Sequence, residues 1–217
     1  MQITLREPGS ALTHFIAMTL ALGGSVPLLI KAAECSSVCL VAMFIFIASM
    51  ILLYAASATY HSVNLPAAII KIYRKVDHAM IFVLIAGSYT PICLLVLAPN
   101  PGYPLLIAVW SFAAVGIAVK LLWINCPKWF SSVIYITMGW LCVFAFTPII
   151  SRLTAAAFGW LLAGGLIYTI GGIIYALKLP IFNAKHKYFG SHEIFHLFVM
   201  AGSLCHYIFM YQYAIGM

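Results

Sequence analysis

The sequence predicts an all-α integral membrane protein, a bundle of seven transmembrane helices. Of its 217 residues, 65% are hydrophobic and only 7% are charged, and the mean hydropathy is +1.10. Soluble domains carry about a quarter charged residues, so this chain has too few polar side chains to cover a water-facing surface. Its apolar runs are continuous and about 20 residues long, enough to cross the membrane as helices, whereas the strands of a membrane barrel alternate apolar and polar residues.

Charged residues and clusters of Pro, Gly and Asn divide the apolar sequence into seven runs. The first run ends near Lys31, a basic stretch precedes the third, and PNPG follows it. The predicted helices span approximately residues 12–32, 37–61, 77–97, 103–124, 129–149, 155–177 and 191–213. Apart from residues 61–77 and 178–190 the connections are short, and no linker separates a second unit. We therefore expect a single membrane domain over residues 1–217.

The distribution of basic residues predicts the orientation of the helices. Those on the N-terminal side of the membrane are Arg6, Lys71, Arg74, Lys75, Lys120, Lys128, Lys178, Lys185 and Lys187. Only Lys31 and Arg152 fall on the other side. Because positive charge is enriched in cytoplasmic connections, the N terminus is predicted to be cytoplasmic and the C terminus outside. The net charge of +7 is spread over these connections instead of forming one patch, so we expect no nucleic-acid partner.

Four ionisable side chains are predicted to lie at one membrane level, on the N-terminal side. His61 closes the second helix, Asp77 opens the third, and His192 and His196 lie in the first two turns of the seventh. Residues four apart share one helix face, so His192 and His196 can hold one metal ion together. With His61 they would leave a fourth position for water, the arrangement of catalytic zinc. Such a site would also explain ionisable groups within membrane helices, where they are costly.

Two of the polar residues at this level have simpler interpretations. Ser57 lies one turn before His61, on the same face, but a membrane serine often bonds the carbonyl one turn back. Asp77 could instead pair with Lys75 or Arg74 at the membrane interface. Both alternatives remain open on the sequence alone.

The remaining ionisable residues near these helices are expected to play lesser parts. His206 lies ten residues beyond His196, about 15 Å deeper, so it cannot join the same metal site. We expect it to be a buried hydrogen-bonding residue or a second polar level in a cavity. His14 begins the first helix at the level of the metal site and could support the metal ligands without binding the metal itself. His78 should point about 100° away from the preceding residue, and Glu193 is expected to contact headgroups or water.

Several segments resemble one known family. They are SATYHSV, DHAMIFVLIAGSYTP, MGWL, GGLIYTIGGIIYALK and HEIFHLFVMAGSLCH. They closely resemble the haemolysin III family of bacterial membrane proteins, relatives of the progestin and adipoQ receptors and, more distantly, of the alkaline ceramidases. The resemblance runs from about ALTHF to the C terminus. It implies a seven-helix bundle with a cytoplasmic N terminus and a zinc ion on the cytoplasmic side, in the bacterial inner membrane.

The resemblance also assigns residues of the metal site. The implied zinc ligands are His61, His192 and His196. Ser57 and Asp77 match the polar pair that accompanies the metal in this wider group. In the first helix the family shows an asparagine four residues before the histidine and a glycine just after it, where this chain has Ser10 and Phe15. This departure weakens any role carried over to His14.

The expected function is metal-assisted hydrolysis of a lipid amide or ester at headgroup depth. A zinc ion would lower the pKa of a bound water, Asp77 would accept its proton, and Ser57 would hydrogen-bond the substrate carbonyl. One alternative is a lipid-responsive regulator or receptor-like protein in which zinc is structural. A pore-forming protein ranks third, because four acidic residues offer little with which to line an aqueous channel. A membrane lipid is the expected substrate or ligand.

Overall fold

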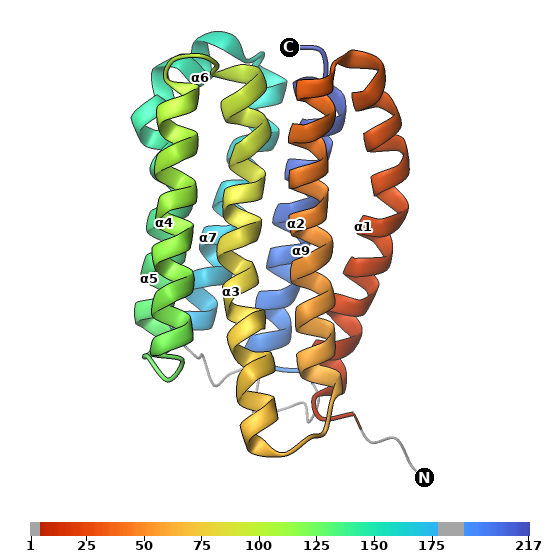
Figure 1. The fold of residues 1–217 in the computed structure, drawn as a ribbon, viewed down its shortest axis with the longest axis vertical. Helices are drawn as coiled ribbons and strands as arrows, with labels where there is room; N and C mark the ends of the chain where they lie inside the picture. The colour runs from red at the N-terminus through yellow and green to blue at the C-terminus, as the bar shows by residue number, and fades with distance from the viewer. Residues whose placement is uncertain (1–4, 178–188) are drawn as a thin grey trace.

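The computed structural model describes residues 5–177 and 189–217, and within them it confirms the predicted class, with seven helical spans and no β-strand. The spans are Pro8–Cys35 (α1), Ser37–Ser62 (α2), Ala67–Val96, Gly102–Leu122 (α4), Lys128–Arg152, Ala155–Leu177 (α7) and Ser191–Ala214. The third span consists of α3 (Ala67–Pro91) and the π-helical turn η1 (Ile92–Val96), and the seventh consists of α9 (Ser191–Phe209) and the π-helical turn η3 (Met210–Ala214). α1 begins at one end of the bundle and the chain ends at the other (Figure 1). Which end faces the cytoplasm stays a prediction, and three of the basic residues behind it, Lys178, Lys185 and Lys187, lie outside the described residues.

The first two helices form a tight antiparallel pair. Pro8 stands at the start of α1, where its missing N–H costs no hydrogen bond. Ser36 is the only residue between the two helices, and its hydroxyl accepts a hydrogen bond from the backbone N–H of Cys39 at 3.0 Å. This N-cap satisfies a donor that the first turn of α2 would otherwise leave free. The short connection therefore fixes α1 beside α2.

The third helix begins earlier than predicted. The sequence predicted a connection up to residue 77, but α3 starts at Ala67, directly after Pro66. The basic residues that lower the hydropathy here are good helix formers. Arg74 donates to the carbonyl of Ile124 at 2.8 Å, just beyond α4, and Lys75 donates to the carbonyl of Leu121 in its last turn, so both stabilise the C-terminal end of α4.

The fifth span is broken where one continuous helix was predicted. It consists of α5 (Lys128–Gly139), the 3₁₀ turn η2 (Leu141–Ala145) and α6 (Phe146–Arg152). The hydroxyl of Tyr89, on α3, donates to the carbonyl of Gly139 at 2.6 Å and accepts from the N–H of Cys142 at 2.9 Å. A helix can break within a membrane only where another group satisfies its backbone, and Tyr89 does so here.

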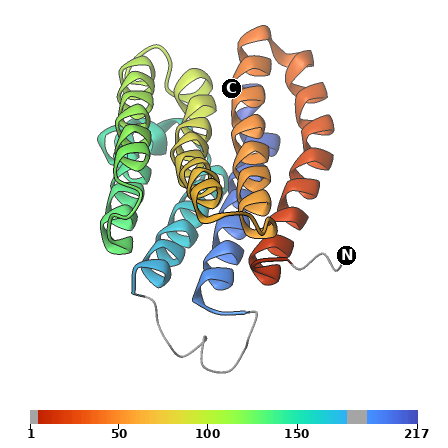
Figure 2. The same cartoon turned by 60° about the horizontal axis from the view of Figure 1, so that its bottom comes forward.

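The helices surround a common interior. Each packs against its neighbours in sequence, and α9 closes the bundle by packing against both α7 and α1. α3 lies between the α1–α2 pair and the α4–α5 pair, with α7 and α9 on the opposite face (Figures 1 and 2). The outward faces carry large apolar side chains such as Leu122 and Phe144, which suit contact with lipid. Polar side chains such as His61 and Asp77 are buried inside.

Candidate metal centre

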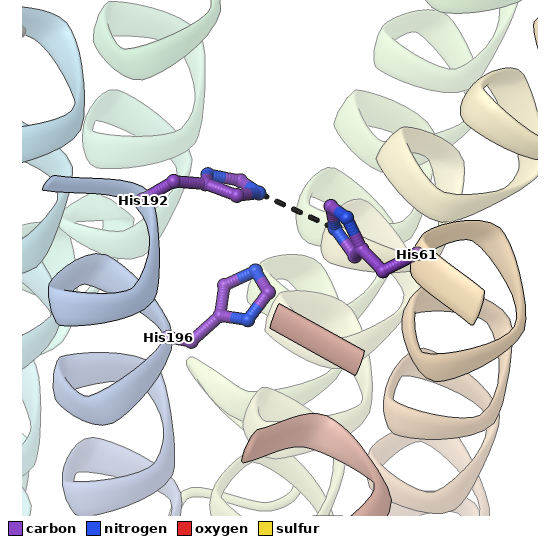
Figure 3. Close-up of side chains that lie close together, drawn as sticks. All are labelled: His61, His192 and His196. Carbon is purple, nitrogen blue, oxygen red and sulfur yellow. Dashed lines mark hydrogen bonds between the residues drawn. The ribbon is translucent and has the colours of Figure 1, made fainter. Parts of the chain in front are cut away.

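Three imidazoles converge near the end of the bundle where α1 begins. His61 comes from the last turn of α2, and His192 and His196 come from the first two turns of α9. The three rings point toward one another (Figure 3). One nitrogen from each ring lies within 4.8 Å of the other two, so the group could hold a metal ion. The His61 and His196 side chains are almost fully buried.

The spacing of these nitrogens fits a shared metal ion. The Nε2 atoms of His61 and His192 lie 3.3 Å apart, longer than the usual N–H hydrogen bond of about 2.9–3.0 Å. Two nitrogens held tetrahedrally at about 2.0–2.1 Å from one zinc ion are separated by roughly 3.3 Å. The ring of His196 lies 4.4 Å from that of His192 and 5.2 Å from that of His61, measured between centroids. A set of three neutral imidazoles suits zinc and other borderline divalent metals.

Side chains at the N-terminal end of the chain orient two of these rings. The Glu7 carboxylate bonds Nδ1 of His61, and the Thr13 hydroxyl lies 3.1 Å from Nδ1 of His196. The hydrogen bond from His61 is the main reason why the pKa of Glu7 falls to about 2, which keeps the carboxylate ionised. Partners at Nδ1 of this kind fix the orientation of metal-binding histidines and leave Nε2 free to bind. Among the described residues Nδ1 of His192 has no such partner.

His14 lies against the site without belonging to the histidine group. Its ring stacks on that of His196, with 3.6 Å between centroids and 10° between the planes. Neither of its ring nitrogens has a hydrogen-bond partner among the described residues. Ser10 bonds the carboxylate of Glu193, which also accepts from the backbone N–H of Gly190 at 2.7 Å. Glu193 therefore ties α9 to α1 and caps its own helix, and its partial exposure leaves the predicted contact with headgroups or water a prediction.

Asp77 and Ser57 lie together beside the histidines. Both are buried, and the Ser57 hydroxyl interacts with the carboxyl group of Asp77. Asp77 is not part of the group of three that meets the metal spacing. The alternative pairing with Lys75 or Arg74 is not seen, because both cations bond residues of α4 and the loop that follows it. Within the described residues no backbone carbonyl accepts from Ser57, so its simpler interpretation is not seen either.

A cavity of about 200 Å³ opens directly beside this site. The side chains of Asp77, Ser57 and His196 line one end of it, and Ile92 and Ile149 line it toward the other end of the bundle. From Asp77 to Ile92 is fifteen residues along α3, or about 22 Å of helix. His78 also lines the cavity, although the sequence predicted that it would diverge from Asp77; its Nε2 lies 4.0 Å from Oδ2 of Asp77.

His206 lies deeper in the bundle, as predicted from its position ten residues after His196. It lines the same cavity, and its Nε2 lies 3.3 Å from the carbonyl oxygen of Leu161. Sequence reasoning missed the partners of the clustered histidine rings, Glu7 and Thr13. The available signal was a carboxylate and a hydroxyl shortly before His14, but their contacts depend on how α1 packs against α2 and α9.

Comparison with known proteins identifies the family. A family described as Haemolysin-III related matches residues 2–207. The chain is 36% identical to Hemolysin-3 of Bacillus cereus over 203 residues, which cover 93% of this chain and 89% of that protein. It is 37% identical to a Hemolysin-3 homolog of Bacillus subtilis over 198 residues, covering 91% and 89%. A shorter match, 42% identical over 60 residues, joins 26% of this chain to 14% of an adiponectin receptor protein of Drosophila melanogaster. The chain therefore belongs to the Haemolysin-III family of multi-pass membrane proteins.

Proposed function

We propose that this protein is a zinc-dependent hydrolase that cleaves an amide or ester bond of a membrane lipid, in one seven-helix domain of the bacterial inner membrane. One observation carries the proposal: three convergent imidazoles, Asp77 and Ser57 stand together at one end of an apolar cavity whose lining follows α3 for about 22 Å. A metal that served only to join helices would need no such cavity. By the basic-residue rule, the site lies on the cytoplasmic side.

His61, His192 and His196 would hold the ion, since their nitrogens supply three neutral ligands at a suitable separation. When bound, zinc supplies Lewis-acid chemistry and lowers the pKa of a coordinated water toward about 7. Glu7 and Thr13 hold the rings of His61 and His196 in the orientation that turns Nε2 inward.

Asp77 and Ser57 supply the proton transfer and the carbonyl contact. Asp77 accepts a proton from the attacking water, whose oxygen bonds to the acyl carbon. Ser57 donates a hydrogen bond to the carbonyl oxygen as negative charge develops on it. The bond from the acyl carbon to nitrogen or oxygen then breaks, and Asp77 returns the proton to the departing amine or alcohol. The products are a fatty acid, whose chain lies in the cavity, and the headgroup part of the lipid.

The test is metal-dependent release of fatty acid by the purified protein in nanodiscs. Parent protein, protein stripped by a chelator and stripped protein restored with zinc would each be incubated with a panel of lipid amides and esters. We expect release by the parent, loss on stripping and recovery on restoration. If the protein is instead a regulator with structural zinc, every sample should bind lipid without releasing fatty acid, and removal of zinc should lower the thermal stability.

The bacterial relatives are named for haemolysis, and a pore is the third candidate. The cavity favours a lipid instead, because most of its lining is apolar, with residues such as Leu84, Ile85 and Val143. Ion-conducting pores are lined by rings of charged or carbonyl groups. Ion conductance in defined vesicles containing the purified protein would contradict the enzymatic proposal if it occurred without lipid hydrolysis.

A further inference from the structure

A second group of polar side chains meets deep inside the bundle. This inner polar cluster comprises Tyr54 of α2, Tyr168 of α7, and Ser203 and His206 of α9. Ser203 and His206 follow His196 by seven and ten residues, so the cluster lies about 10–15 Å deeper than the metal-binding histidines. Tyr168 and His206 line the cavity that begins at Asp77. The hydrolytic mechanism uses none of these four residues.

The hydroxyl groups of the cluster have one hydrogen atom to spare. Tyr54 donates to Ser203 Oγ at 2.7 Å, and Tyr168 and Ser203 share a second hydrogen bond, also of 2.7 Å. Three hydroxyls carry three hydrogens, and these two bonds use two of them. Within residues 5–177 and 189–217 no further acceptor bonds either Tyr168 or Ser203. One O–H donor is therefore left over inside the membrane, where an unsatisfied polar group is costly.

The imidazole of the cluster has an acceptor to spare. A carbonyl oxygen can only accept, so the contact of His206 Nε2 with the Leu161 carbonyl places the ring hydrogen on Nε2. Nδ1 is then a bare acceptor, and among the described residues it has no partner. The His206 and Tyr168 rings lie 5.3 Å apart between centroids, edge to face. The two rings are therefore neighbours, and both residues line the same cavity.

The backbone makes room for these two rings. A Cβ atom on Gly164 would collide with the ring of His206, and one on Gly202 would lie 2.9 Å from the ring of Tyr168. Both glycines stand where α7 and α9 pack against each other, and small residues permit such close approach in membranes. Any larger residue at either position would displace a ring that lines the cavity.

We propose that the inner polar cluster binds a hydroxyl group carried on the chain of the lipid in the cavity. A hydroxyl both accepts the spare O–H hydrogen and donates to Nδ1 of His206, whereas a carbonyl or ether could satisfy only the donor. The inference rests on the proposed function, because the carbonyl end of the lipid is taken to lie beside Asp77. From that level, 10–15 Å corresponds to roughly eight to twelve carbons of an extended chain. The ligand class is thus a mid-chain hydroxy fatty acid or a lipid that contains one.

The experiment measures binding instead of turnover. Stearic acid, 12-hydroxystearic acid and 2-hydroxystearic acid would be titrated into purified, zinc-loaded protein in detergent, with dissociation constants from calorimetry. A site built to pair with a hydroxyl disfavours the analogue that lacks it. We expect 12-hydroxystearic acid to bind about tenfold more tightly than the other two. Equal binding of all three acids would overturn this inference and leave the lipid cavity standing, whereas failure of all three to bind would overturn the proposed function as well.

Variants connect the preference to the cluster. His206→Phe removes the spare acceptor, and Tyr168→Phe removes the hydroxyl of the residue that lines the cavity and leaves the remaining O–H on Ser203, which does not line it. Both variants keep an aromatic ring in place, so the preference should fall to about twofold or less while stearic acid binds as before. The control is Tyr207→Phe, because Tyr207 is adjacent on α9 but donates to the carbonyl of Gly24 at 2.8 Å and does not line the cavity. That variant should keep the full preference. Retention of the tenfold preference by both cluster variants would show that another part of the cavity recognises the hydroxyl and would refute the assignment.

Discussion

Replacing Glu7 with alanine should weaken zinc binding at the three histidines by about 10- to 100-fold. The carboxylate bonds Nδ1 of His61 and so holds that ring with Nε2 turned toward its partners. A separate backbone bond, from the N–H of Glu7 to the carbonyl of His61 at 3.0 Å, survives the substitution and keeps this segment in place. The expected loss corresponds to about 1.4–2.7 kcal/mol of binding free energy. Glu7→Gln keeps an oxygen acceptor but loses the charge, so its affinity should be intermediate.

The assay is competition for zinc between the purified protein and a chelator of known affinity, together with the absorption spectrum of the cobalt-loaded protein. A ring that has lost its partner should alter the cobalt spectrum even where occupancy is restored by excess metal. Glu34→Ala is the matched control, because Glu34 is an exposed acidic residue at the opposite end of α1. Equal zinc affinity for Glu7→Ala and Glu34→Ala, with unchanged cobalt spectra, would refute the orienting role of Glu7.

Three further predictions test the metal ligands, the orientation and the broken helix. His196→Ala should lose most of the bound zinc and His206→Ala should retain it, as metal analysis of folded protein would show; equal loss would contradict the depth assignment. A reporter fused after Pro127 should be active only in the cytoplasm and one fused after Met217 only outside, and the reverse would invert the topology. Tyr89→Phe leaves the N–H of Cys142 without its partner and the Gly139 carbonyl with only the weak thiol contact of Cys142 at 3.8 Å, so it should lower stability by roughly 1–3 kcal/mol, and an unchanged melting temperature would disprove this bridge.

The seven spans and the three convergent histidines were predictable because each depends on local spacing. Apolar runs of membrane length identify helices, and the four-residue interval between His192 and His196 places both rings on one face. His61 could be added because it ends a helix at the same depth. These inferences require only the rise of a helix and the direction in which each helix runs.

The remaining features depend on contacts between distant parts of the chain. Glu7 reaches His61 only because α1 packs against α2, and the break after Gly139 is stable because Tyr89 comes from another helix. The inner polar cluster joins Tyr54 to Ser203 across 149 positions. Hydropathy also misplaced the start of α3, because basic residues interrupt an apolar run without interrupting a helix. Periodicity carries no information about such pairings.

Zinc content and fatty-acid release measured on one sample of Asp77→Asn test the central claim most directly. Asparagine keeps the shape of the side chain and one oxygen acceptor but cannot act as a base. Because Asp77 lies outside the group of three histidines, the variant should keep its zinc and its melting temperature. Its rate of fatty-acid release should fall by about 10²-fold or more, since proton transfer by a positioned base contributes at least that much. Loss of zinc together with thermal stability would instead make Asp77 a structural ligand, and undiminished release would contradict the proposed chemistry.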